Sequence, residues 1–155
     1  MYERILVPID ESETAHRGLL ESISMARATG ASLEIVHVID PYPLAPDWVG
    51  PEDFKALRDK LEGKAKKLLA DAAHEAERAG VRARVRLREV SVERIADVIR
   101  SLATEYACGL VVMGTHGRHG LDRFFLGSTA EAVLRISPVP VLLVPSHRAG
   151  EPLPA

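Results

Sequence analysis

The sequence predicts an α/β fold with an open, five-stranded parallel sheet and helices on both faces. Short β-rich runs alternate strictly with helical patterns along the 155 residues, which is typical of parallel strands joined by helical crossovers. The first, fourth and fifth runs are almost continuously apolar, as are strands covered on both faces. A chain of this length can bury a core of its own, so we expect one domain over residues 1–146 and a flexible tail over 147–155.

The expected strands are Arg4–Ile9, Ser32–Val38, Arg82–Glu89, Gly109–Met113 and Val139–Val144. A first helix is expected over Glu13–Thr29, because Gly30 follows in the position that favours a left-handed cap. Apolar residues recur in steps of three and four from Phe54 to Ala79, which predicts a second helix that ends at Gly80.

The remaining two helices are predicted from their ends. The third lies near Val92–Tyr106, with Ser91 as a suitable N-cap. The fourth begins at Ser128, where Glu131 follows at capping-box spacing. It stops before Pro138, because a residue that precedes proline is pushed out of helical geometry.

The one irregular insert, Asp40–Asp53, carries four prolines and the only tryptophan, Trp48. We interpret it as a loop that could act as a lid, with Trp48 either filling a hydrophobic gap or covering a bound base. It does not mark a domain boundary, because the pieces on either side are each too small to fold alone.

Composition and charge narrow the function classes. Hydrophobic residues make up 46% of the chain and charged residues 27%, as in an ordinary globular domain. The net charge of −2 gives no reason to expect nucleic acid or an anionic membrane as a partner. No apolar run approaches the ~20 residues that span a bilayer, and the N-terminus lacks the apolar core of a signal peptide. The single cysteine, Cys108, cannot form an internal disulfide, so we expect a reducing, cytoplasmic setting.

The most informative segment runs from Gly114 to Thr129. It follows an apolar strand, contains Gly114, Gly117 and Gly127, and leads into the helix at Ser128. Glycines allow tight turns and close approach of a ligand, and the free N–H groups of a helix N-terminus attract anions. The segment therefore predicts a bound phosphate, and we interpret the ligand as a nucleotide.

The composition of the site depends on strand order. With the order 3-2-1-4-5, the loop Pro8-Ile9-Asp10 after the first strand opens into the same crevice as the glycine segment. The Asp10 carboxylate would then suit ribose hydroxyls or a metal, or it could instead cap the first helix. The order 2-1-3-4-5 would separate the two loops.

Two better-known phosphate loops are excluded. A P-loop has a lysine after its last glycine, whereas Gly127 is followed by Ser128 and Thr129. The dinucleotide fingerprint places its glycines after the first strand, and here that strand ends in Pro-Ile-Asp.

From Tyr2 to Val144 the chain resembles the universal stress protein family. Members of that family that bind ATP carry a motif of Gly, two residues, Gly, nine residues and Gly-Ser or Gly-Thr, which the segment from Gly114 to Ser128 reproduces. The segments that also resemble the family's strands are Ile5–Asp10, Val36–Val38 and Ser137–Val144. The resemblance implies an adenine nucleotide alpha hydrolase-like, Rossmann-like sheet, for which we expect the order 3-2-1-4-5. It departs from the family at Val90-Ser91-Val92, where members often have a glycine.

The resemblance also implies ligand contacts. Asp10 would contact the ribose, Pro8 and Ile9 would shape the pocket wall, and Val38 and Met113 would lie near the adenine. The positions that would line the triphosphate are Gly114, Gly117, Gly127, Ser128 and Thr129. The expected ligand is ATP, with Mg²⁺ held mainly through the phosphates.

Other polar residues of the glycine segment have less definite roles. Arg118, which we include in the predicted site, and Arg123 either reach the phosphates or lie in solvent. His116 and His119 lack a third convergent ligand, so we do not expect a zinc site.

The function implied is an ATP-binding stress-response module with at most slow hydrolysis. The alternatives are an ATPase or phosphotransferase with a defined substrate and a nucleotide-free interaction protein of the same fold. Autophosphorylation at Ser128 or Thr129 is compatible with the first reading. Family members commonly form two-fold dimers through the last strand, so we expect a homodimer through Val139–Val144 and a protein partner that the sequence does not identify.

Overall fold

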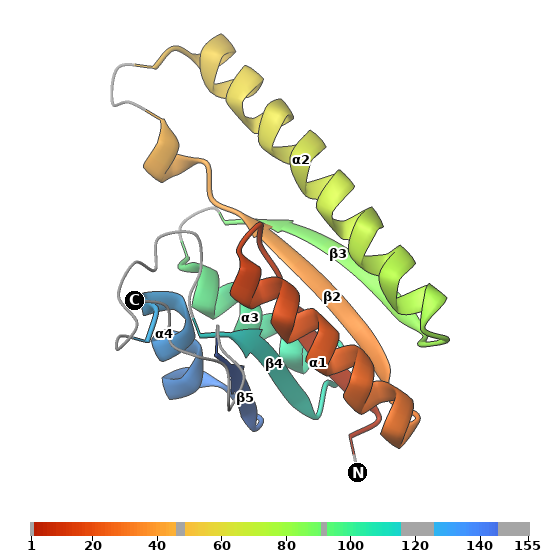
Figure 1. Ribbon diagram of the computed structural model, residues 1–155. Coiled ribbons are helices and arrows are strands. Elements are labelled where there is room, and N and C mark those ends of the chain that lie inside the picture. The colour runs from red at the N-terminus through yellow and green to blue at the C-terminus, as the bar shows by residue number, and fades with distance from the viewer. Residues whose placement is uncertain (1, 46–48, 91–92, 116–125, 146–155) are drawn as a thin grey trace, which may run out of the picture.

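The computed structural model describes residues 2–45, 49–90, 93–115 and 126–145. Its core is a five-stranded parallel sheet in the order β3-β2-β1-β4-β5 (Figure 1). The strands are β1 (Arg4–Pro8), β2 (Ser32–Ile39), β3 (Ala83–Glu89), β4 (Leu110–Gly114) and β5 (Val141–Val144). The predicted fold class and the order 3-2-1-4-5 are therefore confirmed, and the order 2-1-3-4-5 is ruled out.

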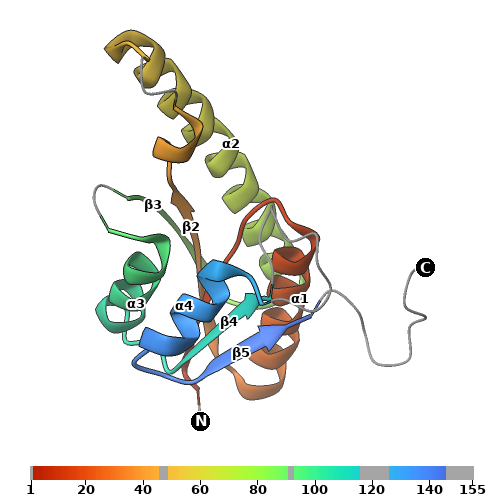
Figure 2. The same cartoon turned by 90° about the vertical axis from the view of Figure 1, so that its left-hand side faces the viewer.

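Four α-helices cover the sheet. They are α1 (Glu13–Thr29), α2 (Pro51–Arg78), α3 (Ile95–Glu105) and α4 (Ser128–Ile136). Successive side chains of a strand point to opposite faces, so Ile5 and Val7 enter the core beneath α1 and α2, while Leu6 enters the core beneath α3 and α4. Figure 2 shows α3 and α4 on the opposite side of the sheet from α1.

Helix α1 has the bounds that the sequence predicted. At its start the Ser12 hydroxyl accepts the N–H of Ala15 at 3.2 Å, and at its end Gly30 adopts a φ of 76°. A left-handed residue at this position terminates a helix with little strain only when it is glycine. Asp10 does not cap the helix, because Ser12 occupies the N-cap position.

The predicted start of α3 is wrong, whereas the predicted start of α4 at Ser128 is confirmed. Helix α3 begins at Ile95 with Arg94 as its N-cap, so Ser91, which lies outside the described residues, does not cap it. The Asp97 carboxylate, three residues into the helix, accepts the Arg94 N–H at 3.4 Å, as the acidic residue of a capping box does. At α4 the N-cap is Gly127, which has no side chain with which to cap the helix, and Ser128 is the first helical residue.

The proline-rich insert and the last strand also differ from expectation. The insert contains a 3₁₀ turn, η1 (Tyr42–Leu44), and gives way to α2 already at Pro51, because the fixed φ of proline suits the first position of a helix. Trp48 lies outside the described residues. Strand β5 starts two residues after Val139, since Pro140 has no N–H to donate to the ladder.

Helix α2 is 28 residues long, and its N-terminal half projects beyond the sheet (Figure 1). Its buried residues all belong to the second half: Ala65, Leu69, Ala72 and Ala76. Among the described segments, no helix combines the length and the apolar character needed to cross a membrane.

Candidate functional site

A cavity of about 560 Å³ opens at the carboxyl ends of β1, β2 and β4. Its size falls in the range of sites that bind small molecules. It lies where the sheet order reverses, because β1 pairs with β2 on one side and with β4 on the other. Residues from η1, α2, α3 and the start of α4 complete its wall.

The structure brings the described members of the predicted site together around this cavity. They are Pro8, Ile9, Asp10, Val38, Met113, Gly114, Gly127, Ser128 and Thr129. The other two predicted members, Gly117 and Arg118, lie outside the described residues, as do His116, His119 and Arg123.

The turn after β1 is held by hydrogen bonds to both backbone groups of Ile9, its N–H and its carbonyl. The Ile9 N–H donates to the Val36 carbonyl at 2.8 Å, and the His37 Nδ1 lies 2.8 Å from the Ile9 carbonyl oxygen. A carbonyl oxygen only accepts, so His37 carries its proton on Nδ1. One oxygen of the next residue, Asp10, accepts the Ser12 N–H at 2.8 Å. The Asp10 carboxylate is therefore presented on a fixed backbone at the cavity.

Sequence reasoning did not assign His37 to the site. This side chain is buried and lines the cavity. The available signal was its position as a polar residue inside the otherwise apolar run from Ile35 to Ile39, since a buried polar group needs a hydrogen-bond partner.

The start of α4 faces the same cavity from the side of β4. Gly127 is extended, its N–H donates to the Thr115 carbonyl at 2.8 Å, and its carbonyl accepts the Glu131 N–H at 2.9 Å. Ser128 is the first helical residue, so the N–H groups that precede Glu131 in the helix have no partner within it. These donors and the positive end of the helix dipole are groups that can bind an anion.

Gly114 has a different reason to be glycine from the one the sequence suggested. A Cβ at this position would lie 2.6 Å from the carbonyl carbon and 2.7 Å from the carbonyl oxygen of Thr14. From the other side, a Cβ on Gly18 of α1 would lie 3.2 Å from the Gly114 nitrogen. The close approach at Gly114 is thus made by the backbone of α1, which sets the distance between α1 and β4.

Part of the cavity lining is apolar. Val38 and Met113 are joined there by residues that sequence analysis did not place in the site: Pro43, Leu44, Leu61, Ile95 and Ile99. Asp40 adds a second carboxylate, and one of its oxygens accepts the Tyr42 N–H at 3.2 Å. The described residues contain no group of three or more histidine, cysteine or acidic residues that could hold a metal ion.

Comparison with known proteins gives consistent matches over the whole domain. The model of the universal stress protein family matches residues 1–145. Universal stress protein A homolog 1 of Coxiella burnetii is 31% identical over 149 residues, which cover 92% of this chain and 96% of that protein.

Two solved structures share the fold. The structure of the protein MJ0577 superposes with a TM-score of 0.81 at 27% identity and covers 96% of this chain and 99% of its own. A universal stress protein in complex with cAMP has a TM-score of 0.69 at 26% identity, with 94% and 99% of the two chains covered.

Proposed function

This chain belongs to the universal stress protein family, and we propose that it binds an adenine nucleotide, with ATP as its ligand, in the cavity at the carboxyl ends of β1, β2 and β4. The observation that carries the proposal is that the start of α4, the Asp10 carboxylate and a set of apolar side chains line one cavity. A nucleotide presents phosphates, hydroxyls and an apolar base, which suit these three kinds of lining group. A related protein of the family forms a complex with cAMP, which supports this ligand class.

The proposed contacts follow from the chemistry of each wall. The phosphates would accept hydrogen bonds from the first N–H groups of α4, at Ser128 and Thr129. The ribose hydroxyls would donate to the Asp10 oxygen that Ser12 does not engage. The base would pack between Val38 and Met113. Mg²⁺ would be held mainly by phosphates and water, as is usual for this ion.

We propose that nucleotide occupancy is the signal of a cytoplasmic stress-response module formed by residues 1–146. The first experiment is to denature freshly purified protein and separate any released nucleotide by ion exchange. Stoichiometric ATP would support a sensor with slow turnover. Stoichiometric ADP or AMP would instead favour an ATPase, and turnover above about one per second would establish it.

Gly127→Val tests the phosphate side of the site. The φ of −59° and ψ of 146° at Gly127 are open to any residue, so valine adds bulk at the cavity without backbone strain. We expect ATP affinity, measured by calorimetry, to fall at least about tenfold through blocked access to the helix N–H groups. Gly63→Val is the matched control, because a Cβ at Gly63 in α2 meets no atom within 4 Å. Equal ATP affinity in the two folded variants would refute the proposed phosphate site.

We also propose a homodimer formed by the free edges of β5 in two copies. This strand ends the sheet, and its side chains are apolar throughout, with Leu142 37% exposed. An exposed apolar edge is a liability unless it is covered or paired. Sedimentation equilibrium at micromolar concentration tests the dimer, and a monomer there would contradict it.

A further inference from the structure

The opposite edge of the sheet, at β3, has an unusual arrangement of backbone and arginine groups. The Arg82 carbonyl accepts the Leu33 N–H and the Val90 N–H donates to the Ile39 carbonyl, so even-numbered residues of this segment face β2. The backbone groups of the residues between them face away from the sheet. In agreement, the outward carbonyls of Val85 and Leu87 accept from side chains.

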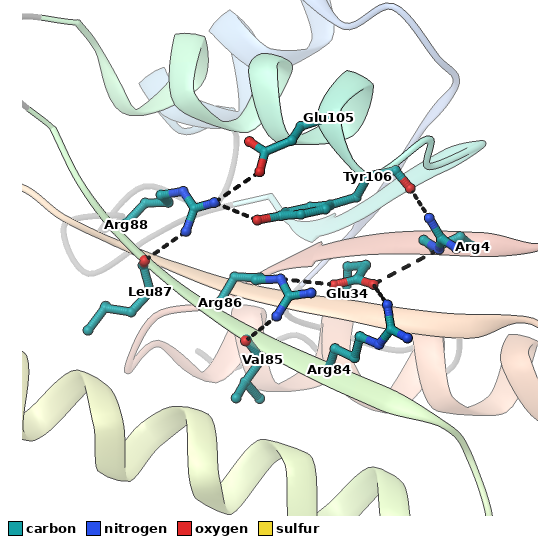
Figure 3. A network of polar contacts seen from close by, with 9 residues as sticks. All are labelled: Arg4, Glu34, Arg84, Val85, Arg86, Leu87, Arg88, Glu105 and Tyr106. Atoms are coloured by element: carbon teal, nitrogen blue, oxygen red, sulfur yellow. Dashed lines mark hydrogen bonds and ion pairs between the residues drawn. The ribbon is translucent and has the colours of Figure 1, made fainter.

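The arginines of β3 bend over this edge. Arg86 Nη1 donates to the Val85 carbonyl at 3.4 Å and Arg88 Nη1 to the Leu87 carbonyl at 3.3 Å (Figure 3). Both contacts are long for hydrogen bonds to a carbonyl, so they are weak and readily exchanged. Arg84 precedes them on the same face, and alternate residues of a strand lie about 7 Å apart.

A buried carboxylate and an aromatic ring hold these guanidinium groups in place. Glu34 of β2 is 2% exposed and lies 3.4 Å from Arg86 Nε and 3.9 Å from Arg84 Nη1. The Tyr106 ring lies 4.8 Å from the Arg86 guanidinium carbon and 5.9 Å from that of Arg88. Holding the side chains beforehand lowers the entropy lost when they bind a ligand.

Their charge is only partly neutralised. Arg4, Arg84 and Arg86 surround the single carboxylate of Glu34, so three cations face one anion; within the described residues Glu34 Oε2 and Arg86 Nε form an ion pair at 3.4 Å without hydrogen-bond geometry. Arg88 pairs with Glu105 at 3.2 Å and also donates to the Tyr106 hydroxyl. The side chains of Arg84 and Arg88 remain 69% and 37% exposed. The β3 edge is therefore cationic on a chain whose net charge is −2.

We propose that the β3 edge is a docking site for an acidic, extended segment of a partner protein. The segment adds as a further strand beside β3, and its N–H groups take over the carbonyls of Val85 and Leu87. The released guanidinium groups of Arg86 and Arg88, together with that of Arg84, then bind carboxylates at alternate positions of the segment. A second copy of this chain does not fit, because it would place arginines against arginines.

An extended peptide fits better than another polyanion for two reasons. The outward N–H and C=O groups of Val85 and Leu87 match a peptide backbone, which a nucleic acid or a lipid headgroup does not offer. The repeat of arginines at every second residue matches the side-chain repeat of a strand. The site is also independent of the nucleotide cavity, which β3 does not line.

The test uses a fluorescent peptide of about eight residues, the length of a strand, with glutamate and threonine alternating. Its control has glutamine in place of glutamate. We expect the full chain to bind the glutamate peptide about tenfold more tightly, by fluorescence anisotropy at low salt. The double variant Arg84→Gln/Arg88→Gln should lose that preference. The variant Arg27→Gln/Arg135→Gln removes the same charge from α1 and α4 and should keep it.

A third variant separates strand addition from simple charge attraction. Val85→Pro removes an N–H that faces away from β2, so the ladder between β2 and β3 keeps its bonds. We expect Val85→Pro to weaken binding of the glutamate peptide, whereas Arg27→Gln/Arg135→Gln should leave that binding unchanged. Equal binding of the two peptides, or no effect of the β3 arginine variant, would overturn the proposal. Single-stranded RNA that binds as tightly and is indifferent to Val85→Pro would also overturn it, in favour of a general polyanion surface.

Discussion

The two edge strands of the sheet, β3 and β5, both have unpaired backbone groups but carry opposite kinds of side chain. Both β3 and β5 leave one row of backbone groups without a neighbouring strand. Strand β5 has four residues, all apolar, whereas β3 has seven, of which Arg84, Arg86 and Arg88 share one face. An apolar edge can pair with its own copy, but an edge lined with arginine repels its copy and attracts an acidic chain. The comparison indicates that the β5 edge serves self-association and that the β3 edge serves a different partner.

The largest expected effect is on the dimer. Leu142→Glu would bury a carboxylate without a partner between two β5 strands, so we expect the dimer to weaken at least about 100-fold. Val85→Glu on β3 is the matched control, because Val85 and Leu142 are equally exposed at 37%. Sedimentation equilibrium should find Leu142→Glu monomeric and Val85→Glu dimeric. The reverse result would exchange the roles of the two edges.

A second effect concerns the stability of the β3 edge. Arg86 Nε is the cation nearest to the buried Glu34, at 3.4 Å, so Arg86→Met leaves that carboxylate poorly compensated. We expect the free energy of unfolding, from urea titration, to fall by about 1–3 kcal/mol. Arg84→Met should change it by less than about 0.5 kcal/mol, because Arg84 is mostly exposed and lies farther away. Similar losses of unfolding free energy in both variants would show that Arg86 does not stabilise the protein through its ion pair with Glu34.

Salt should weaken binding at the β3 edge much more than binding at the β5 edge. Raising the ionic strength from about 0.05 M to about 0.5 M screens exposed charges and should weaken binding of the glutamate peptide to β3 about tenfold. The β5 dimer is apolar and should change by less than about twofold under the same conditions. The check is anisotropy for the peptide and sedimentation for the dimer. A dimer as sensitive to salt as the peptide would contradict an apolar interface.

The smallest expected effect is on the pKa of the Cys108 thiol, which is influenced by the charges of Glu34 and Arg4. Burial, and secondarily the negative charge of Glu34, raise the pKa of the Cys108 thiol to about 11, because both disfavour the thiolate. Glu34→Gln removes the second cause, so the thiolate should form at lower pH. The pH dependence of the alkylation rate should shift downward in this variant and stay unchanged in Leu142→Glu. A loosened fold would raise the alkylation rate at every pH, whereas a lowered thiol pKa shifts the pH profile, so the profile separates the two causes.

Much of the fold could be predicted because its signals are local. The apolar runs located all five strands to within two residues at each end, and Gly30 marked the end of α1 correctly. The starts of α1 and α4 were predicted correctly, but two N-cap residues were not, since several residues near a boundary can occupy that position. At α3 the backbone becomes helical only after Arg94, and at α4 only after Gly127, so the serines expected to cap these helices do not.

The sequence by itself determined the alternation of strands and helices, the family and the residues at the mouth of the cavity. Only the tertiary structure decided that Gly114 makes room for α1, that Leu44 and Leu61 form the apolar wall, and that His37 holds the turn before Asp10. It also decided that Arg84 and Arg86 of β3 lie around Glu34. The reason is that hydrophobic period and caps act between near neighbours in the chain, whereas a cavity or a charge cluster depends on which distant segments the sheet order brings together.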